Sequence, residues 1–256
     1  MSSLSYQVET WGTVILIELS SQKLSEDKLV IAAQEAQQFL LKVDELFSTY
    51  REDSQVSSLR ADSLKIEKTD PLVKEVWERC LQARESTGGA FDPWKVDGGF
   101  DPSGFVKGWA ADKCGQIFEK YGIENSLVNA AGDISVRGGL LIDGAVKPWP
   151  LQIRNPEKFD EVVKDIPINN GAVATSGVGE KGSHIRDPFT GLIAIGALSA
   201  TVIGPDGGIA EALATALVVL GKDGAVLFEK PELDKYWGFV IDRHSNTSWQ
   251  VSGSAL

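Results

Sequence analysis

The sequence predicts a mixed α/β protein of the α+β class, forming a single domain over residues 1–256. Short runs rich in β-branched residues, such as residues 14–19, are typical of strands. Between them lie segments such as residues 25–47, in which apolar residues recur at helical spacing. The composition, 43% hydrophobic and 24% charged, is that of a globular protein, and this length can bury a large core.

The first half of the chain predicts one strand and several helices. The strand spans residues 14–19, and the longer helices span residues 25–47, 70–86 and 109–121. Ser25 and Pro71 are placed to begin the first two of these helices, and Ser54 to cap a short turn that runs through Leu59. Gly88 and Gly89 indicate an unusual backbone or a close approach to another group.

The second half is expected to be mainly strands with one further helix. Predicted strands cover residues 126–138 with a central glycine break, then residues 149–154, 171–175, 197–203 and 237–241. Prolines at 148, 150, 156 and 167 favour loops and strand edges in between. A helix is predicted over Ile209 to Leu220, with Gly221 as its C-terminal stop, and a polar tail ends the chain.

The charge of the chain argues against nucleic acid and anionic membranes as partners. The formal net charge is −11 and the isoelectric point is about 4.7. The chain shows neither a signal peptide nor an apolar run of spanning length, so a cytoplasmic protein without membrane insertion is expected. Cys80 and Cys114 lack metal-ligand spacing and are expected to be reduced packing residues.

A glycine-rich stretch, residues 175–191, carries the first candidate for catalysis. His184 follows three glycines of this stretch, and Pro188 and Gly191 frame a tight turn with Thr190 between them. A histidine at the mouth of such a loop can take a proton at neutral pH. The alternative is a solvated hairpin whose histidine has no chemical role.

Two further positions favour anion or metal binding. Lys107, flanked by glycines near the start of a predicted helix, is a candidate anion site, although the P-loop pattern is absent. Glu211 and Thr215 are four residues apart, so both oxygen donors lie on one helix face. Alternatively, Glu211 only stabilises the helix dipole and Thr215 bonds to its own backbone.

Taken together, the motifs resemble the ApbE family, the FAD:protein FMN transferases. Seven segments carry the resemblance in order: Phe47-Ser48-Thr49-Tyr50 with Asp53-Ser54, Thr87-Gly88-Gly89-Ala90-Phe91-Asp92, Asp101-Pro102-Ser103-Gly104 with Lys107-Gly108 and Asp112, Asn129-Ala130-Ala131-Gly132-Asp133, Ala174-Thr175-Ser176-Gly177, His184-Ile185 with Asp187-Pro188 and Thr190-Gly191, and Ala210-Glu211-Ala212 with Thr215-Ala216. The resemblance implies an FAD cleft between sheet-and-helix subdomains. It also implies a magnesium-dependent reaction that moves FMN onto a Thr or Ser of a target protein and releases AMP.

The resemblance also implies roles for individual residues. His184 matches the base for the target hydroxyl. The expected FAD contacts are Tyr50, Ala90, Phe91, Asp92, Asp101, Lys107 and Ile185. The expected Mg²⁺ ligands are the side chains of Glu211 and Thr215 and the backbone carbonyls of Gly104 and Gly208. Oxygen donors of this kind are the ligands that Mg²⁺ prefers.

This chain departs from the family pattern at three points. Trp11-Gly12-Thr13 replaces Met-Gly-Thr, Ala131-Gly132-Asp133 replaces Gly-Gly-Asp, and Glu211 replaces the metal-binding aspartate. The extra methylene of Glu211 moves the carboxylate by about one bond length. Two alternatives to the transferase therefore stay open: an FAD-binding protein without transferase activity, and an FAD pyrophosphatase that gives FMN and AMP.

Overall fold

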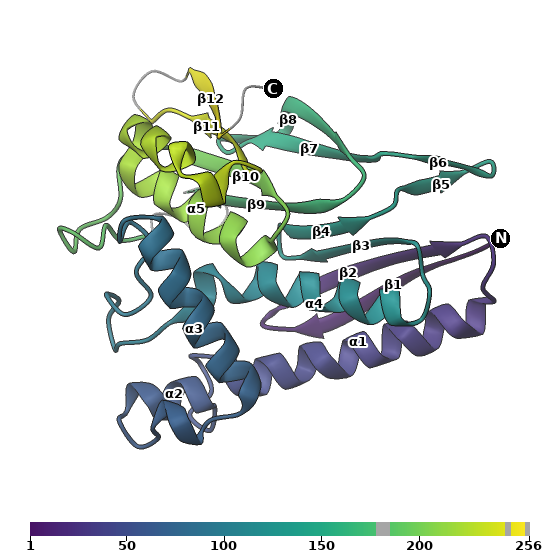
Figure 1. The fold of residues 1–256 in the computed structure, drawn as a ribbon, viewed down its shortest axis with the longest axis horizontal. Coiled ribbons are helices and arrows are strands. Elements are labelled where there is room, and N and C mark those ends of the chain that lie inside the picture. The colour runs from purple at the N-terminus through teal and green to yellow at the C-terminus, as the bar shows by residue number, and fades with distance from the viewer. Residues whose placement is uncertain (178–184, 244–246, 254–256) are drawn as a thin grey trace.

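The computed structural model describes residues 1–177, 185–243 and 247–253 (Figure 1). Its helices are α1 Glu26–Phe47, α2 Gln55–Arg60, α3 Pro71–Ser86, α4 Val106–Lys120 and α5 Gly207–Leu220, with short 3-10 turns that include η2 Pro102–Gly104. Its strands are β1 Ser2–Thr10, β2 Thr13–Ser21, β3 Asn125–Ala130, β4 Asp133–Arg137, β5 Leu140–Ile142, β6 Ala145–Lys147, β7 Trp149–Asn155, β8 Lys158–Ile168, β9 Gly171–Gly177, β10 Ser199–Gly204, β11 Trp237–Ile241 and β12 Ser248–Ser252.

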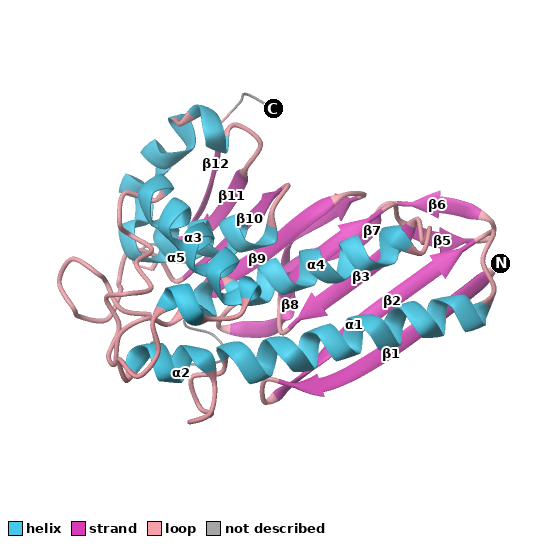
Figure 2. Ribbon diagram, turned by 60° about the horizontal axis from the view of Figure 1, so that its bottom comes forward, coloured by secondary structure: helices cyan, strands magenta, loops and turns pink. Residues whose placement is uncertain are grey.

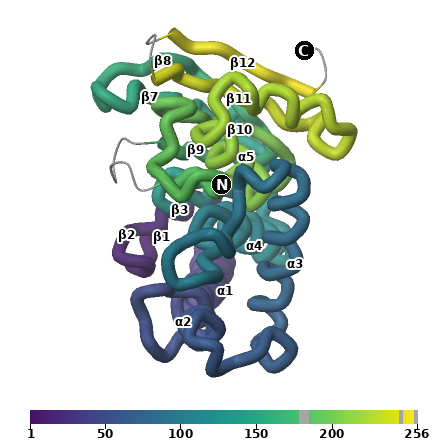
Figure 3. The backbone as a smooth tube through the Cα atoms, turned by 90° about the vertical axis from the view of Figure 1, so that its left-hand side faces the viewer, coloured from purple at the N-terminus to yellow at the C-terminus, as the bar shows by residue number. Residues whose placement is uncertain are grey.

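One antiparallel sheet holds most of these strands, in the order β1-β2-β3-β4-β9-β10-β11-β12. Its first hairpin turns at Trp11 and Gly12, which both have positive φ angles, 56° and 68°. A two-residue turn of this handedness matches the twist of the flanking strands. Figure 3 shows the β11–β12 pair at the top of the molecule and β1 and β2 below it on the left, at the two edges of the sheet.

The helices cover one face of the sheet. Helices α1 and α4 lie side by side over β1 to β4, and α5 packs on β9 and β10 (Figure 2). The α1 face that points to the sheet is apolar, and it includes three small, fully buried residues, Ala32, Ala33 and Ala36. Short side chains at these positions let the helix approach its neighbours closely, and the resulting core is continuous with that under α4.

The opposite face carries a second layer that the sequence did not predict. Strands β7 and β8 form a separate ribbon, and Ile153 and Ile166 of this ribbon pack on Val173, Leu198 and other apolar residues of the main sheet. The predicted strand at residues 149–154 is confirmed as β7, whereas β8 was not predicted, because the prolines favoured loops and strand edges there. Pro150 and Pro167 pair with each other in the ribbon, where both strands have a free edge that tolerates a missing N–H donor.

Most other predicted elements are confirmed, with shifted ends. Helix α4 begins at Val106, three residues before the predicted start, and α5 begins at Gly207. Ser54 caps α2 through a hydrogen bond from the Ser57 amide, whereas the side chain of Ser25 makes no cap bond to α1. The sequence analysis missed β1 and the tail strand β12.

No helix in the described part of the chain is both long and apolar enough to cross a membrane.

Candidate active site

A cavity of about 590 Å³ lies where the glycine-rich motifs meet. This volume is within the range of small-molecule sites, about 300–1,000 Å³. The β3–β4 turn, β9 and α5 contribute residues to the cavity, and so do the β7–β8 ribbon and the loops at residues 90–104 and 185–188. The lining therefore draws on segments far apart in the sequence.

Many of the predicted site residues meet in this cavity. Those that line it are Ala90, Phe91, Asp92, Asp101, Gly104, Ile185, Glu211 and Thr215. Tyr50 does not line it, because it lies in the loop after α1 with 98% of its surface exposed. Gly208 does not line it either, since it is buried in the first turn of α5 beside the Phe105 ring. His184 lies outside the described residues.

Two glycines allow α4 and α5 to cross at close range. A Cβ atom on Gly108 would lie 2.2 Å from the carbonyl oxygen of Gly207, and a Cβ on Gly207 would lie 2.5 Å from that of Gly108. Both contacts are with backbone, so no side-chain rotation could relieve them. The crossing places the first turn of α4, with Lys107, against Glu211 of α5.

Lys107 connects two acidic side chains at this crossing. Its Nζ atom contacts Oε1 of Glu211 and Oδ2 of Asp133, which begins β4. The other Glu211 oxygen accepts a hydrogen bond of 3.0 Å from the Gly108 amide. We call Lys107, Gly108, Asp133, Gly207 and Glu211 the floor of the site.

The charges of the floor residues perturb one another. Burial raises the pKa of Glu211 to about 8, the charge of Asp133 acts in the same direction, and Lys107 and the Gly108 amide oppose the shift. Burial by itself would lower the pKa of Lys107, but the two carboxylates outweigh it and raise that pKa. Strongly shifted groups in one cavity are typical of functional sites.

Further oxygen donors lie one helical turn along α5. The Thr215 hydroxyl is 3.0 Å from the Ser176 hydroxyl of β9. A Cβ atom placed on Gly104 would be 3.7 Å from Oγ1 of Thr215 and 3.2 Å from the Phe91 ring. The Gly104 backbone, the hydroxyl of Thr215 and the Phe91 ring therefore converge at this end of the cavity.

The donor set fits a hard cation such as Mg²⁺. Glu211 and Thr215 both line the cavity, as does Gly104, and carboxylate, hydroxyl and carbonyl oxygens are its usual ligands. Oδ1 of Asp133 is buried and has no hydrogen-bond partner, so it has a lone pair to offer. Across residues 1–177, 185–243 and 247–253 there is no cluster of three or more His, Cys, Asp or Glu side chains suited to a metal. A cation here would depend on this mixed set and on phosphate oxygens of a ligand.

Residues 92–101 and 185–195, which we call the rim, form the outer wall. Asp92 is buried and pairs with Arg84 of α3 at 2.8 Å. Arg60 donates to the carbonyl of Asp97 at 2.6 Å, and its Nη1 lies 3.6 Å from Oδ2 of Asp101. Asp101 in turn accepts from the Ser103 amide at 2.9 Å, which fixes η2 and its last residue, Gly104.

The predicted turn at residues 187–191 is confirmed in the second part of the rim. The Gly191 amide donates to the Asp187 carbonyl at 2.8 Å, and the Asp187 carboxylate accepts from the Phe189 amide and the Thr190 hydroxyl. Large apolar side chains stay exposed on this hairpin: Phe189, Leu192, Ile193 and Ile195.

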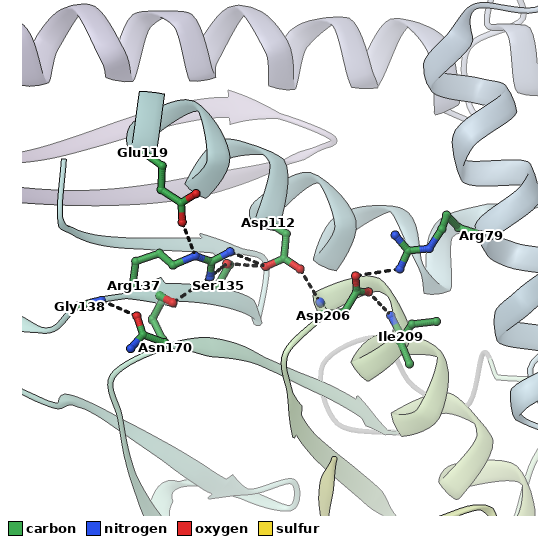
Figure 4. A network of polar contacts seen from close by, with 11 residues as sticks. Arg79, Asp112, Glu119, Ser135, Arg137, Gly138, Asn170, Asp206 and Ile209 are labelled. Atoms are coloured by element: carbon green, nitrogen blue, oxygen red, sulfur yellow. Dashed lines mark hydrogen bonds and ion pairs between the residues drawn. The ribbon is translucent and has the colours of Figure 1, made fainter. Parts of the chain in front are cut away.

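A buried polar network supports the floor from behind (Figure 4). Asp112 of α4 accepts from the Gly207 amide at 2.6 Å and from the Ser135 hydroxyl at 2.6 Å. Asp206 caps α5 by accepting from the Ile209 amide, and Arg79 of α3 holds its other oxygen at 2.8 Å. The network ties α3, α4, α5 and β4 together around the start of α5.

Four residues found at or behind the cavity had no role assigned from the sequence: Asp112, Asp133, Arg154 and Phe159. Asp112 and Asp133 were present in the motifs, and the acidic character of Asp133 directly after Gly132 was the available signal. Arg154 and Phe159 line the cavity from the β7–β8 ribbon. Arg154 lies in the predicted strand 149–154 but no motif singled it out, and Phe159 lies in β8, which was not predicted.

The chain matches the family model described as "ApbE family" over residues 11–97 and 95–237. It is 35% identical over 135 residues to the FAD:protein FMN transferase of Escherichia coli K12, a match covering 49% of this chain and 38% of that protein. It is 34% identical over 167 residues to the enzyme of the same name from Haemophilus influenzae, covering 61% and 47%. The match thus spans less than half the length of either relative.

Solved structures share the fold over nearly the whole chain. The flavin transferase ApbE from Vibrio cholerae superposes with a TM-score of 0.84 at 22% identity, covering 98% of both chains. An ApbE protein from Thermotoga maritima gives a TM-score of 0.81 at 24% identity, covering 98% and 97%. The predicted mixed α/β fold is confirmed by these likenesses.

Proposed function

The chain belongs to the ApbE family, and we propose that it is a magnesium-dependent FAD:protein FMN transferase. One observation carries the proposal: residues from the predicted FAD-contact and metal motifs line one cavity, with Glu211 and Thr215 side by side on α5. The names of the matched relatives support the same activity.

In the proposed reaction, a Thr or Ser hydroxyl oxygen of the target bonds to the FMN phosphorus. The bond from that phosphorus to the bridging oxygen breaks, and AMP leaves with that oxygen. His184 accepts the hydroxyl proton, and FMN ends in a phosphoester. Bound Mg²⁺ would offset the negative charge that develops on the pyrophosphate.

In this proposal, other residues in and beside the cavity bind and orient FAD. Lys107 is the phosphate partner, because a flexible ammonium can follow a moving charge. Asp101, Ile185 and residues 90–92 hold the nucleotide against the cavity wall. Tyr50, which is exposed in the structure, remains a predicted flavin contact, and Gly208 a predicted carbonyl ligand.

The test is a transfer assay with FAD, Mg²⁺ and several flavin-accepting proteins. We expect a fluorescent target band and one AMP released per flavin attached. His184→Ala should keep FAD binding and slow transfer by about two to four orders of magnitude, the usual contribution of a positioned base. A complete lack of transfer to every acceptor would refute the proposal.

A second function, hydrolysis of FAD to FMN and AMP, is favoured by Glu211 in place of the family aspartate. A shifted carboxylate changes how a metal would hold the pyrophosphate, and water is always available as an acceptor. Release of AMP and free FMN without any target protein would identify this activity. Bound FAD that yields no AMP with Mg²⁺ would instead indicate a flavin-binding protein.

Glu211 itself can be tested by magnesium titration at saturating FAD. Glu211→Gln should raise the Mg²⁺ concentration needed for half-maximal activity, because a charged ligand becomes neutral. Glu211→Asp restores the family residue and should keep or improve activity. If Glu211 only stabilises the helix dipole, Glu211→Gln should leave the Mg²⁺ titration curve unchanged and lower the unfolding free energy by about 0.3–1 kcal/mol.

A further inference from the structure

We propose that Lys107 is an exchangeable internal cation. When no nucleotide is bound, the Lys107 ammonium pairs with the carboxylates of Glu211 and Asp133. When a nucleotide binds, its phosphates attract the ammonium, and a divalent cation takes the position between the two carboxylates. In this arrangement Asp133 is an additional metal ligand, and metal binding depends on the nucleotide. The inference rests on the proposed function, whose substrate supplies the phosphates.

The contacts of Lys107 are the first argument. Its ammonium lies between Oε1 of Glu211 and Oδ2 of Asp133. The two carboxylate side chains are 4% and 5% exposed, whereas that of Lys107 is 22% exposed. Two nearly buried carboxylates need a positive charge close by, and the lysine supplies it.

The balance of charge is the second argument. When Glu211 and Asp133 are both ionised, the two carboxylates and one ammonium leave a surplus of one negative charge in the floor. A divalent cation in place of the ammonium would bring the sum to zero. The exchange therefore improves the local charge balance if the ammonium can pair with another anion. A pyrophosphate bound in the neighbouring cavity would be that anion.

The unpaired oxygen of Asp133 is the third argument. Oδ1 is buried and accepts no hydrogen bond, a costly arrangement for a carboxylate. Residues on both sides of Asp133, namely Gly132 and Ile134, line the cavity. A cation bound between Asp133 and Glu211 would satisfy this oxygen and lie beside the cavity that the nucleotide is proposed to fill.

The side-chain type suits the exchange. Lysine carries a compact charge on a flexible four-carbon stem, so it can move between two anionic partners without a fixed hydrogen-bond geometry. Lys107 lies in the first turn of α4, where the positive end of the helix dipole also favours phosphate. The Gly108 amide keeps Glu211 in place at 3.0 Å while the lysine moves.

The test measures Mg²⁺ binding by calorimetry and melting temperature, without flavin or acceptor protein. Wild type should bind Mg²⁺ weakly and show little change in Tm. Lys107→Met should bind Mg²⁺ at least about tenfold more tightly, and Mg²⁺ should raise its Tm, because its two carboxylates have lost their cation. Lys107→Arg, which keeps a positive charge, should behave like wild type.

Removing one acid tests whether Asp133 is a ligand. The double variant Lys107→Met with Asp133→Asn should lose most of the gain in Mg²⁺ affinity. The proposal is overturned if Lys107→Met binds Mg²⁺ no more tightly than wild type, or if the double variant keeps the whole gain. Tight Mg²⁺ binding by wild type in the absence of nucleotide would also overturn it.

Folding of the variant is part of the test. If Lys107→Met folds only in Mg²⁺ and unfolds in EDTA, the metal has replaced the lysine, as proposed. If it stays unfolded with or without Mg²⁺, no exchange occurs and the proposal fails. These measurements contain no FAD, so failure of the proposed transferase activity would leave their outcome unaffected.

Discussion

The floor, which reaches the cavity through Glu211, and the rim, which forms the outer wall, are held in different ways. The floor is fixed by backbone contact between Gly108 and Gly207 and by buried hydrogen bonds through Asp112. The rim is held by side chains that reach across from other elements, such as Arg60, and leaves large apolar groups such as Leu192 exposed.

Substitutions in the floor and in the rim should therefore have different effects. Close packing in the floor leaves no room for adjustment, so a change there alters both stability and the position of Lys107 and Glu211. The rim has fewer buried contacts, so a change there should alter ligand affinity while the fold persists. Each variant below tests one side of this comparison, from the largest expected effect to the smallest.

Gly108→Ala should have the largest effect. Its Cβ would meet the Gly207 carbonyl oxygen at 2.2 Å, so α4 and α5 must separate. We expect a loss of about 3 kcal/mol in unfolding free energy, measured by urea denaturation, together with weaker binding of FAD.

Gly115→Ala is the matched control on the same helix. A Cβ there would lie 3.6 Å from the Arg137 guanidinium, an ordinary contact. This variant should be neutral or more stable by about 0.5–1 kcal/mol, because alanine favours a helix. Equal destabilisation of the two variants would show that the crossing has no special role.

Asp112→Ala should have the next largest effect. It leaves the Gly207 amide and the Ser135 hydroxyl without their acceptor, and burial of such groups costs about 1–3 kcal/mol. A double-mutant cycle with Ser135→Ala should give a coupling energy of about 0.5–3 kcal/mol. Strict additivity of the two changes would indicate that the network does not act as a unit.

Arg60→Ala should affect ligand affinity more than stability. The guanidinium holds the Asp97 carbonyl and lies near Asp101, so its loss should free the loop at residues 92–101. We expect the Kd for FAD to rise by about tenfold, with a stability change near 1 kcal/mol or less. Flavin fluorescence titration and urea denaturation measure the two quantities.

Lys65→Ala provides the control for this loss of charge. Lys65 pairs with Asp62 on the surface, with side chains 65% and 83% exposed. Such a pair contributes little, so both stability and FAD affinity should stay at wild-type values. If Lys65→Ala lowered FAD affinity by a similar factor, the effect of Arg60→Ala would be due to the loss of one positive charge.

Leu192→Ser should have the smallest effect on the isolated protein. The residue is 69% exposed at the rim, so the change in unfolding free energy should stay within about 0.5 kcal/mol. FAD affinity should also be unchanged, because Leu192, unlike Ile185 of the same rim segment, does not line the cavity. A loss above 1 kcal/mol would mean that the hairpin is coupled to the core and that the rim resembles the floor.

Local patterns predicted much of the fold and part of the site. Helices α1, α3 and α5 follow from helical spacing, and Gly221 ends α5 with a φ of 58° as expected. The placement of Glu211 and Thr215 on one helix face needed only the helical repeat. The sequence motifs also indicated which loops would reach the cavity, and residues 90–92 and Ile185 line it.

What the sequence by itself determined is the identity of elements whose signals lie within a few residues, such as caps, turns and apolar periodicity. The tertiary structure alone decided which distant groups meet. Lys107 contacts Glu211 across 104 residues and Asp133 across 26, and strand β8 forms because its apolar residues find the far face of the sheet. The contact between Lys107 and Glu211 depends on the close approach of two backbones at Gly108 and Gly207, which no local pattern specifies.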